Sequence, residues 1–84
     1  MSGARHEVAR TPVEIQAVYK VIEAVTRAAL EMALNTARDS RTAEMIALHA
    51  TIPARLIAEG VDPVRASALA RGIRVQVDVA EDGN

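Results

Sequence analysis

A chain of 84 residues forms one domain at most, and a domain of this size buries only about 60% of the surface that its unfolded chain exposes. Half of the residues are hydrophobic, but 17 of these are alanine and Tyr19 is the only aromatic residue. Without cysteine the chain has no disulfide framework and no thiolate metal site, so self-association is the remaining way to stabilise so thin a core. Ten basic residues against eleven acidic ones exclude a strong overall field that would attract nucleic acid or an anionic membrane.

The sequence contains no apolar run of the length that a membrane span needs, and no signal-peptide core follows Met1. We therefore expect a soluble, cytoplasmic protein. Nine of the ten basic residues are arginine, a composition that favours a bacterial or phage-encoded gene.

Residues 1–10 combine small and charged residues without any period, which predicts a flexible arm. The first helix signal follows directly. Thr11 suits the N-cap, Pro12 suits the first helical position, and Glu14 completes a capping box. A helix is therefore predicted to begin here and to run to about Ala37, opening a single helical domain that we assign to residues 11–79.

Apolar residues with three- and four-residue spacing form a seam of nearly three heptads along this helix: Ile15, Val18, Ile22, Val25, Ala29 and Met32. A flanking row of small residues widens the apolar face, and Glu14, Lys20 and Glu23 are placed on the outer face. A helix of about 25 residues is nearly 40 Å long. That is longer than the short helices after it can cover, which favours packing against a twin over packing within one chain.

Polar cap-forming residues at 35–42 predict a break, with Asp39 or Ser40 capping a second helix, although one continuous helix through residue 50 is the alternative. Pro53 must then kink or stop the second helix. A short helix is expected to follow through Glu59, with Gly60 at its left-handed end. Asp62 and the proline after it repeat the cap signature and open a last helix to Arg71.

The sequence changes in character at residues 73–79, where apolar and polar residues alternate strictly. This alternation predicts a β-strand with one apolar face, formed by Ile73, Val75, Val77 and Val79. No second segment alternates in this way, so we expect the strand to pair with its copy in a twin, or with a partner's strand. Residues 80–84 form an acidic tail.

Residues suited to catalysis or to ligand binding are few. His6 and His49 are the only imidazoles, and His49 is interpreted as a half-buried helix residue. The serines lack an adjacent base, and the four glycines are too scattered to form a phosphate loop. We therefore expect no enzyme, no cofactor, no metal and no small-molecule substrate.

The segment 51–67 resembles the helix-turn-helix of lactose-repressor-type regulators at four positions: Gly60, Val61, Pro63 and Ser67. It departs from that motif at Leu56, where an alanine is usual, and at Arg55, where an apolar residue is usual. The resemblance implies DNA binding through the pair of helices at 53–71. The arginines that would contact DNA are Arg55, Arg65, Arg71 and Arg74. Their segment has a net charge of only +2, a weak footprint for several phosphate contacts.

Taken together, the sequence predicts a mainly α fold with one long helix, two or three short helices and a C-terminal strand that pairs with a twin in a homodimer. The expected function is that of a small non-enzymatic interaction module with a regulatory, adaptor or assembly role. It would bind itself through the seam and the strand, and it would also bind another protein. The alternative is a DNA-binding transcriptional regulator.

Overall fold

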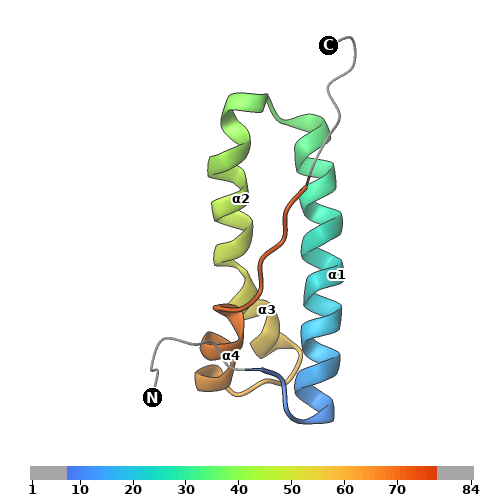
Figure 1. Ribbon diagram of the computed structural model, residues 1–84, viewed down its shortest axis with the longest axis vertical. Coiled ribbons are helices and arrows are strands. Elements are labelled where there is room, and N and C mark those ends of the chain that lie inside the picture. The colour runs from blue at the N-terminus through green and yellow to red at the C-terminus, as the bar shows by residue number, and fades with distance from the viewer. Residues whose placement is uncertain (1–7, 78–84) are drawn as a thin grey trace.

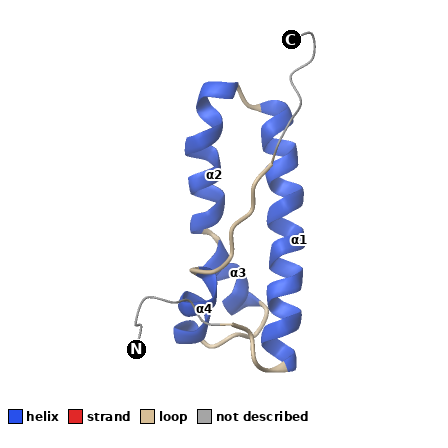
Figure 2. Cartoon of the chain, viewed as in Figure 1, coloured by secondary structure: helices blue, strands red, loops and turns tan. Residues whose placement is uncertain are grey.

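The computed structural model describes residues 8–77, which form helices and loops, and no strand occurs within this range (Figures 1 and 2). The mainly α fold is thus confirmed. Residues 1–7 and 78–84, including most of the predicted arm, the tail and Val79, lie outside the described part. The elements in chain order are α1 (Pro12–Asn35), the short 3₁₀ helix η1 (Arg38–Ser40), α2 (Arg41–Ala50), α3 (Ile52–Ala58) and α4 (Pro63–Ala70).

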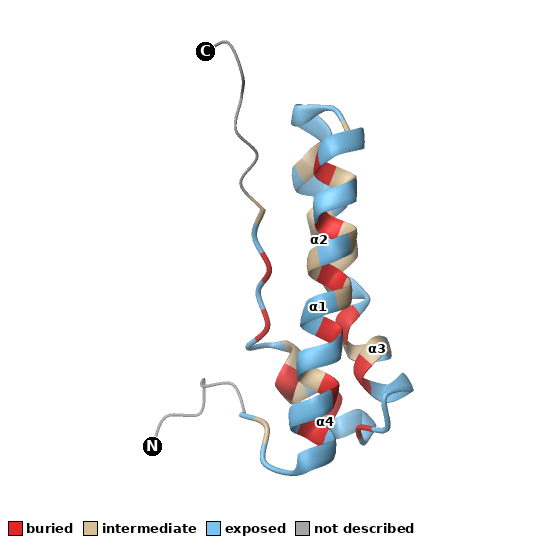
Figure 3. Cartoon of the chain, turned by 90° about the vertical axis from the view of Figure 1, so that its right-hand side faces the viewer, coloured by how far each residue is buried: buried red, intermediate tan, exposed pale blue. Residues whose placement is uncertain are grey.

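Helices α1 and α2 lie side by side and run in opposite directions, joined through η1 (Figure 1). The short helices α3 and α4 pack against each other at the end of the pair where α1 begins. From there the segment 73–77 runs back in an extended course along one face of the α1–α2 pair (Figures 1 and 3). The fold is therefore a helical hairpin, closed at one end by two short helices and crossed by the C-terminal segment.

Side-chain caps start the first and the last helix as predicted. The Thr11 hydroxyl accepts a hydrogen bond from the Glu14 amide at 3.1 Å. The Asp62 carboxylate accepts from the amides of Val64 and Arg65 at 3.0 and 3.3 Å. A proline follows each cap, where its missing N–H is not needed.

The predicted breaks are also found. Helix α1 ends at Asn35, two residues before the expected Ala37, and the chain turns through η1 into α2. Ser40 occupies the N-cap position of α2, but its side chain makes no capping hydrogen bond there. The break between α2 and α3 falls at Thr51, just before Pro53. Gly60 has a φ of +103°, in the left-handed region that other residues rarely adopt.

The buried face of α1 differs from the predicted seam. It consists of residues four apart, most of them small: Ala17, Val21, Val25, Ala29 and Ala33. Contrary to the expectation from its length, this face is covered within one chain, because α2 and α3 pack against α1 in series. Small side chains on α1 let the neighbouring helices approach closely. The core side combines Ala17 and Val21 of the predicted flanking row with Val25 and Ala29 of the predicted seam.

The core continues from this row into α3, α4 and the C-terminal segment. Leu56 and Ile52 are its largest fully enclosed side chains. The other members outside α1 come from the turn before α4, from α4 and from the segment 73–77: Val61, Ala66, Leu69, Ile73 and Val75.

The segment 73–77, predicted as part of a strand, is extended but does not belong to a sheet in the described part of the chain. Its alternation of apolar and polar residues nevertheless appears as an alternation of buried and exposed side chains. Ile73 and Val75 are buried, with 6% and 7% of their surface exposed, whereas Arg74 and Gln76 are exposed. Figure 3 shows buried and exposed residues alternating along it. The apolar face lies on the helices of the same chain, so burial does not require a twin's strand.

Candidate functional site

The structure separates the predicted helix seam into three groups. Val25 and Ala29 belong to the core of the single chain, and Val18 and Met32 are half-buried. Ile15 and Ile22 are exposed. Only the last pair is thus presented to a partner. The seam residues do not form one continuous exposed surface.

A different set of large apolar side chains is exposed along α1. Its members, which we call the α1 stripe, are Ile15, Tyr19, Ile22, Leu30 and Leu34. Thr26, half-buried, occupies the gap in the middle. Tyr19 and Leu30 are eleven residues apart, close to three full turns, so they face nearly the same way. The stripe therefore runs along most of the helix on one side.

At Tyr19 this side of α1 lies opposite the core. Tyr19 is two residues from both Ala17 and Val21, a rotation of about 200° around the helix axis. Tyr19 is 78% exposed, whereas Ala17 and Val21 are almost completely covered. A partner can therefore reach the stripe without displacing any other helix.

The N-terminal half of the stripe contains a hollow of about 680 Å³. It is lined by Ile15, Gln16, Tyr19, Lys20, Ile22 and Glu23. Residues spaced by three and four positions form the holes into which a neighbouring helix inserts its side chains. The hollow thus has the composition of a helix-packing site, with an apolar centre and a polar rim.

Charged side chains follow one flank of the stripe in alternating sign: Lys20, Glu23, Arg27 and Glu31. Glu23 and Arg27 form an ion pair at 3.9 Å, and Lys20 lies 3.7 Å from the Glu59 carboxylate in the turn after α3. Both pairs are exposed and contribute little to the stability of the fold. Their charges remain accessible to a partner.

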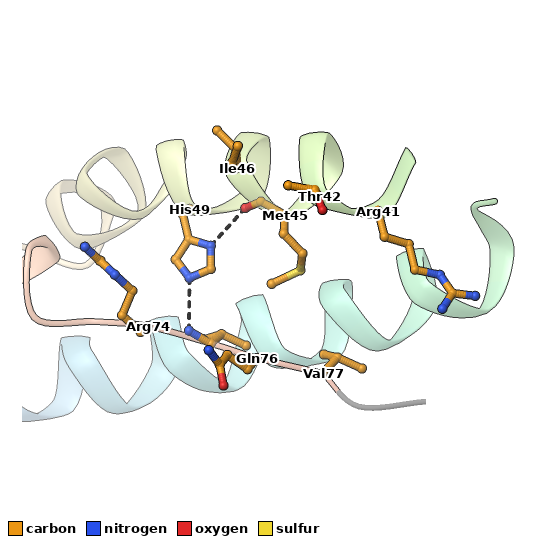
Figure 4. Close-up of a pocket in the computed structure, with 9 residues that line it drawn as sticks. Arg41, Thr42, Met45, Ile46, His49, Arg74, Gln76 and Val77 are labelled. Atoms are coloured by element: carbon orange, nitrogen blue, oxygen red, sulfur yellow. Dashed lines mark hydrogen bonds between the residues drawn. The ribbon is translucent and has the colours of Figure 1, made fainter. Parts of the chain in front are cut away.

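A second surface lies between α2 and the C-terminal segment, where His49 joins the two elements (Figure 4). The Val75 amide donates to His49 Nε2 at 3.0 Å, so this nitrogen carries no proton. The proton is then on Nδ1, which donates to the Met45 carbonyl at 2.9 Å. The neutral ring thus clamps the segment to α2.

The groove beside this clamp has a volume of about 840 Å³ and is open to solvent. Arg41 and Arg74 stand toward its two ends, with Ile46 and Gln76 between them (Figure 4). The groove holds one imidazole and no carboxylate among its lining residues. Within residues 8–77 no three histidine, cysteine, aspartate or glutamate side chains gather as a metal site requires.

The four arginines considered for DNA contact are not equally available. Arg65, at the start of α4, donates through Nε and Nη2 to the two Glu14 carboxylate oxygens, each at 2.8 Å, and its Nη2 also donates to the Val8 carbonyl. Arg55 donates to the Thr51 hydroxyl. Arg71 and Arg74 are exposed. The structure therefore does not bring the four together as one basic surface.

The Glu14 carboxylate is the one buried charged group in the described chain. The Arg65 side chain and then the Arg10 amide, which donates to it at 2.9 Å, lower the pKa of Glu14 from 4.5 to about 2, and burial acts in the opposite direction. This pair joins the start of α1 to α4. It also holds residues 8–10, the described end of the predicted arm, because the Val8 carbonyl accepts from Arg65 and the Arg10 amide donates to Glu14.

Sequence reasoning placed Glu14 on the outer face and saw it only as a capping residue. Its partner Arg65 is 51 positions away, and the partner of His49 is a backbone amide 26 positions away. Neither contact has a local signal. The exposed stripe does have a local signal, because Tyr19, Leu30 and Leu34 are large residues at helical spacing. This signal overlaps with the pattern of the predicted seam.

Comparisons with protein-family models, with curated proteins and with solved structures find no match for the chain. No helix between residues 8 and 77 combines the length and hydrophobicity needed to cross a membrane. The surfaces described above are therefore the basis for assigning a function.

Proposed function

We propose that this protein is a small non-enzymatic interaction module that works as a homodimer, with a regulatory, adaptor or assembly role. The α1 stripe supports this proposal, because it exposes five large apolar side chains on one face of the longest helix. An exposed apolar stripe flanked by charged side chains is typical of a protein contact surface. The groove beside the C-terminal segment and the other helix faces stay accessible to a further protein partner.

The energetics favour a partner for the stripe. Full burial of an aliphatic or aromatic side chain of this size contributes about 1.5–3 kcal/mol. In a homodimer the stripe is buried twice, once from each copy. The five side chains are 37–78% exposed in the single chain, so burying what remains of ten of them contributes a gain of the same order as an association cost of about 4–15 kcal/mol. The same face of a monomer would leave all of this surface in water.

A pair of matched substitutions tests the proposal. Tyr19→Asp places a charge in the stripe, and Val64→Asp places one on α4 at nearly the same exposure, 77% against 78%. Neither side chain is in the core, so both variants should keep the helical circular-dichroism spectrum. Sedimentation should show a dimer for the parent chain and for Val64→Asp, and a monomer for Tyr19→Asp. A parent chain that is monomeric at tens of micromolar would overturn the proposal.

DNA binding is the second candidate, because α3 and α4 pack as a helix pair around the Gly60 turn. It ranks lower since Arg65, the arginine at the head of α4, is engaged with Glu14. DNA binding predicts a mobility shift that weakens steeply with salt and is lost in an Arg71→Ala, Arg74→Ala double variant. Retention of duplex DNA only at low salt, unchanged by that variant, would exclude it.

A further inference from the structure

Four of the five residues of the α1 stripe are placed symmetrically about its midpoint. That midpoint falls between Ala24 and Val25. Ile15 and Leu34 lie equally far from it on opposite sides, and so do Tyr19 and Leu30. When such a helix is turned end over end, these four side chains each meet another large one, whereas Ile22 meets Arg27. A self-complementary surface of this kind is what a two-fold interface requires.

The charged flank is matched only approximately. The mirror position of Glu23 is residue 26, next to Arg27, and that of Lys20 is residue 29, two residues from both Arg27 and Glu31. Turning the helix end over end brings Lys20 of one copy near Glu31 of the other, and Glu23 near Arg27, within one turn in each case. In an antiparallel pair the same flanks of the two helices face each other, so these four contacts join opposite charges. In a parallel pair the charged flank would instead face the side of α1 that its own core covers, and the charges would have no partners in the other copy.

The hollow in the stripe fits this arrangement as well. It surrounds Tyr19, and the mirror position of Tyr19 is Leu30, an exposed side chain. Leu30 of each copy can therefore insert into the hollow of the other. Because steps of four residues advance slowly around a helix, two such stripes align when the helices cross at an angle.

We infer that two copies of the chain pair through antiparallel α1 helices, about a two-fold axis that passes between Ala24 and Val25. This inference rests on the proposed function and defines its partner as a second copy in one orientation. The pairing places Tyr19 and Leu30 in contact near the centre and Ile15 and Leu34 at the ends. The face of α2 with the C-terminal segment stays outside the interface.

Cross-linking tests the orientation directly, because the natural chain has no cysteine. Ile15→Cys and Leu34→Cys are prepared separately, mixed, left to exchange subunits, and oxidised or treated with a short bis-maleimide. The antiparallel pair predicts a mixed cross-linked dimer. Each variant alone should stay uncross-linked, since its two cysteines would be about 28 Å apart along the axis. Val64→Cys on α4 is the control and should not cross-link.

The outcomes separate the two proposals. Self-cross-linking of Ile15→Cys alone would show a parallel dimer, which overturns the antiparallel arrangement and leaves the homodimer. A dimer by sedimentation without the mixed cross-link would overturn it as well, and would place the interface elsewhere. A monomer by sedimentation would overturn the homodimer itself.

Charge reversal gives a second readout that does not depend on cysteines. Glu31→Lys should weaken dimerisation roughly 3- to 10-fold at low salt, because two symmetric ion pairs are lost. Adding Lys20→Glu should restore it. Residues 20 and 31 are about 16 Å apart within one helix, too far to pair in the same chain. Rescue therefore reports contact between copies, and a double variant weaker than Glu31→Lys alone would contradict the arrangement.

Discussion

The C-terminal segment should contribute as much to stability as a helix does, and one substitution tests this. Val75→Ser replaces a side chain that is only 7% exposed. Its full burial contributes about 1.5–3 kcal/mol, against about 3–5 kcal/mol for the whole core of so small a domain. We therefore expect a loss of about 2 kcal/mol and a fall in Tm of roughly 10 °C.

The neighbouring Gln76→Ser is the matched control, because Gln76 is exposed in the same segment. It should change stability by no more than about 0.5 kcal/mol. Urea and thermal unfolding followed by circular dichroism measure both variants. Amide exchange gives an independent check: the Val75 amide, bonded to His49, should exchange more slowly than those of Arg74 and Gln76. Equal stabilities for the two variants, with uniformly fast exchange, would show that the segment does not pack on the helices.

Three further outcomes follow from the same contacts. Because the pKa of Glu14 is lowered in the folded chain, its ionised carboxylate stabilises the fold above pH 4.5. This contribution should be lost as the pH falls from about 4.5 to about 2, and Glu14→Gln should flatten the acid branch of the curve of stability against pH. His49→Phe should cost about 1–3 kcal/mol and speed exchange of the Val75 amide, because that N–H loses its acceptor. Leu56→Ala should cost about 2–5 kcal/mol in urea unfolding, while the exposed Ile57→Ala beside it should cost less than about 1 kcal/mol.

The ends of the helices could be predicted from the sequence because their causes are local. Thr11 and Asp62 cap the helices whose first residues are prolines, and Pro53 cannot continue a helix from α2. Gly60 supplies a backbone conformation that a side chain would strain. Each of these signals acts within four residues, so no knowledge of the tertiary structure was needed.

The orientation of α1 could not be predicted in the same way. Its sequence carries two overlapping apolar patterns, one of small residues such as Ala17 and Ala33, and one of larger ones such as Ile15 and Ile22. Pattern reading favours the larger side chains, because they contribute more to burial. Close approach of α2 and α3 favours the smaller ones. Which side faces the chain's own core depends on neighbours far away in the sequence, and these are not visible in a local spacing.

The prediction of a strand at residues 73–79 shows what alternation does and does not report. Alternating apolar residues require one buried face. A sheet supplies such a face, but the surface between two helices supplies one too, and Ile73 and Val75 are buried there. The backbone groups of an extended segment also need hydrogen-bond partners, which a neighbouring strand would supply. In the described segment a histidine side chain meets that need for the Val75 amide, and exposure to water can meet it for residues such as Gln76. The pattern therefore determines which side of the segment is buried, whereas the partner of its backbone depends on a residue in α2.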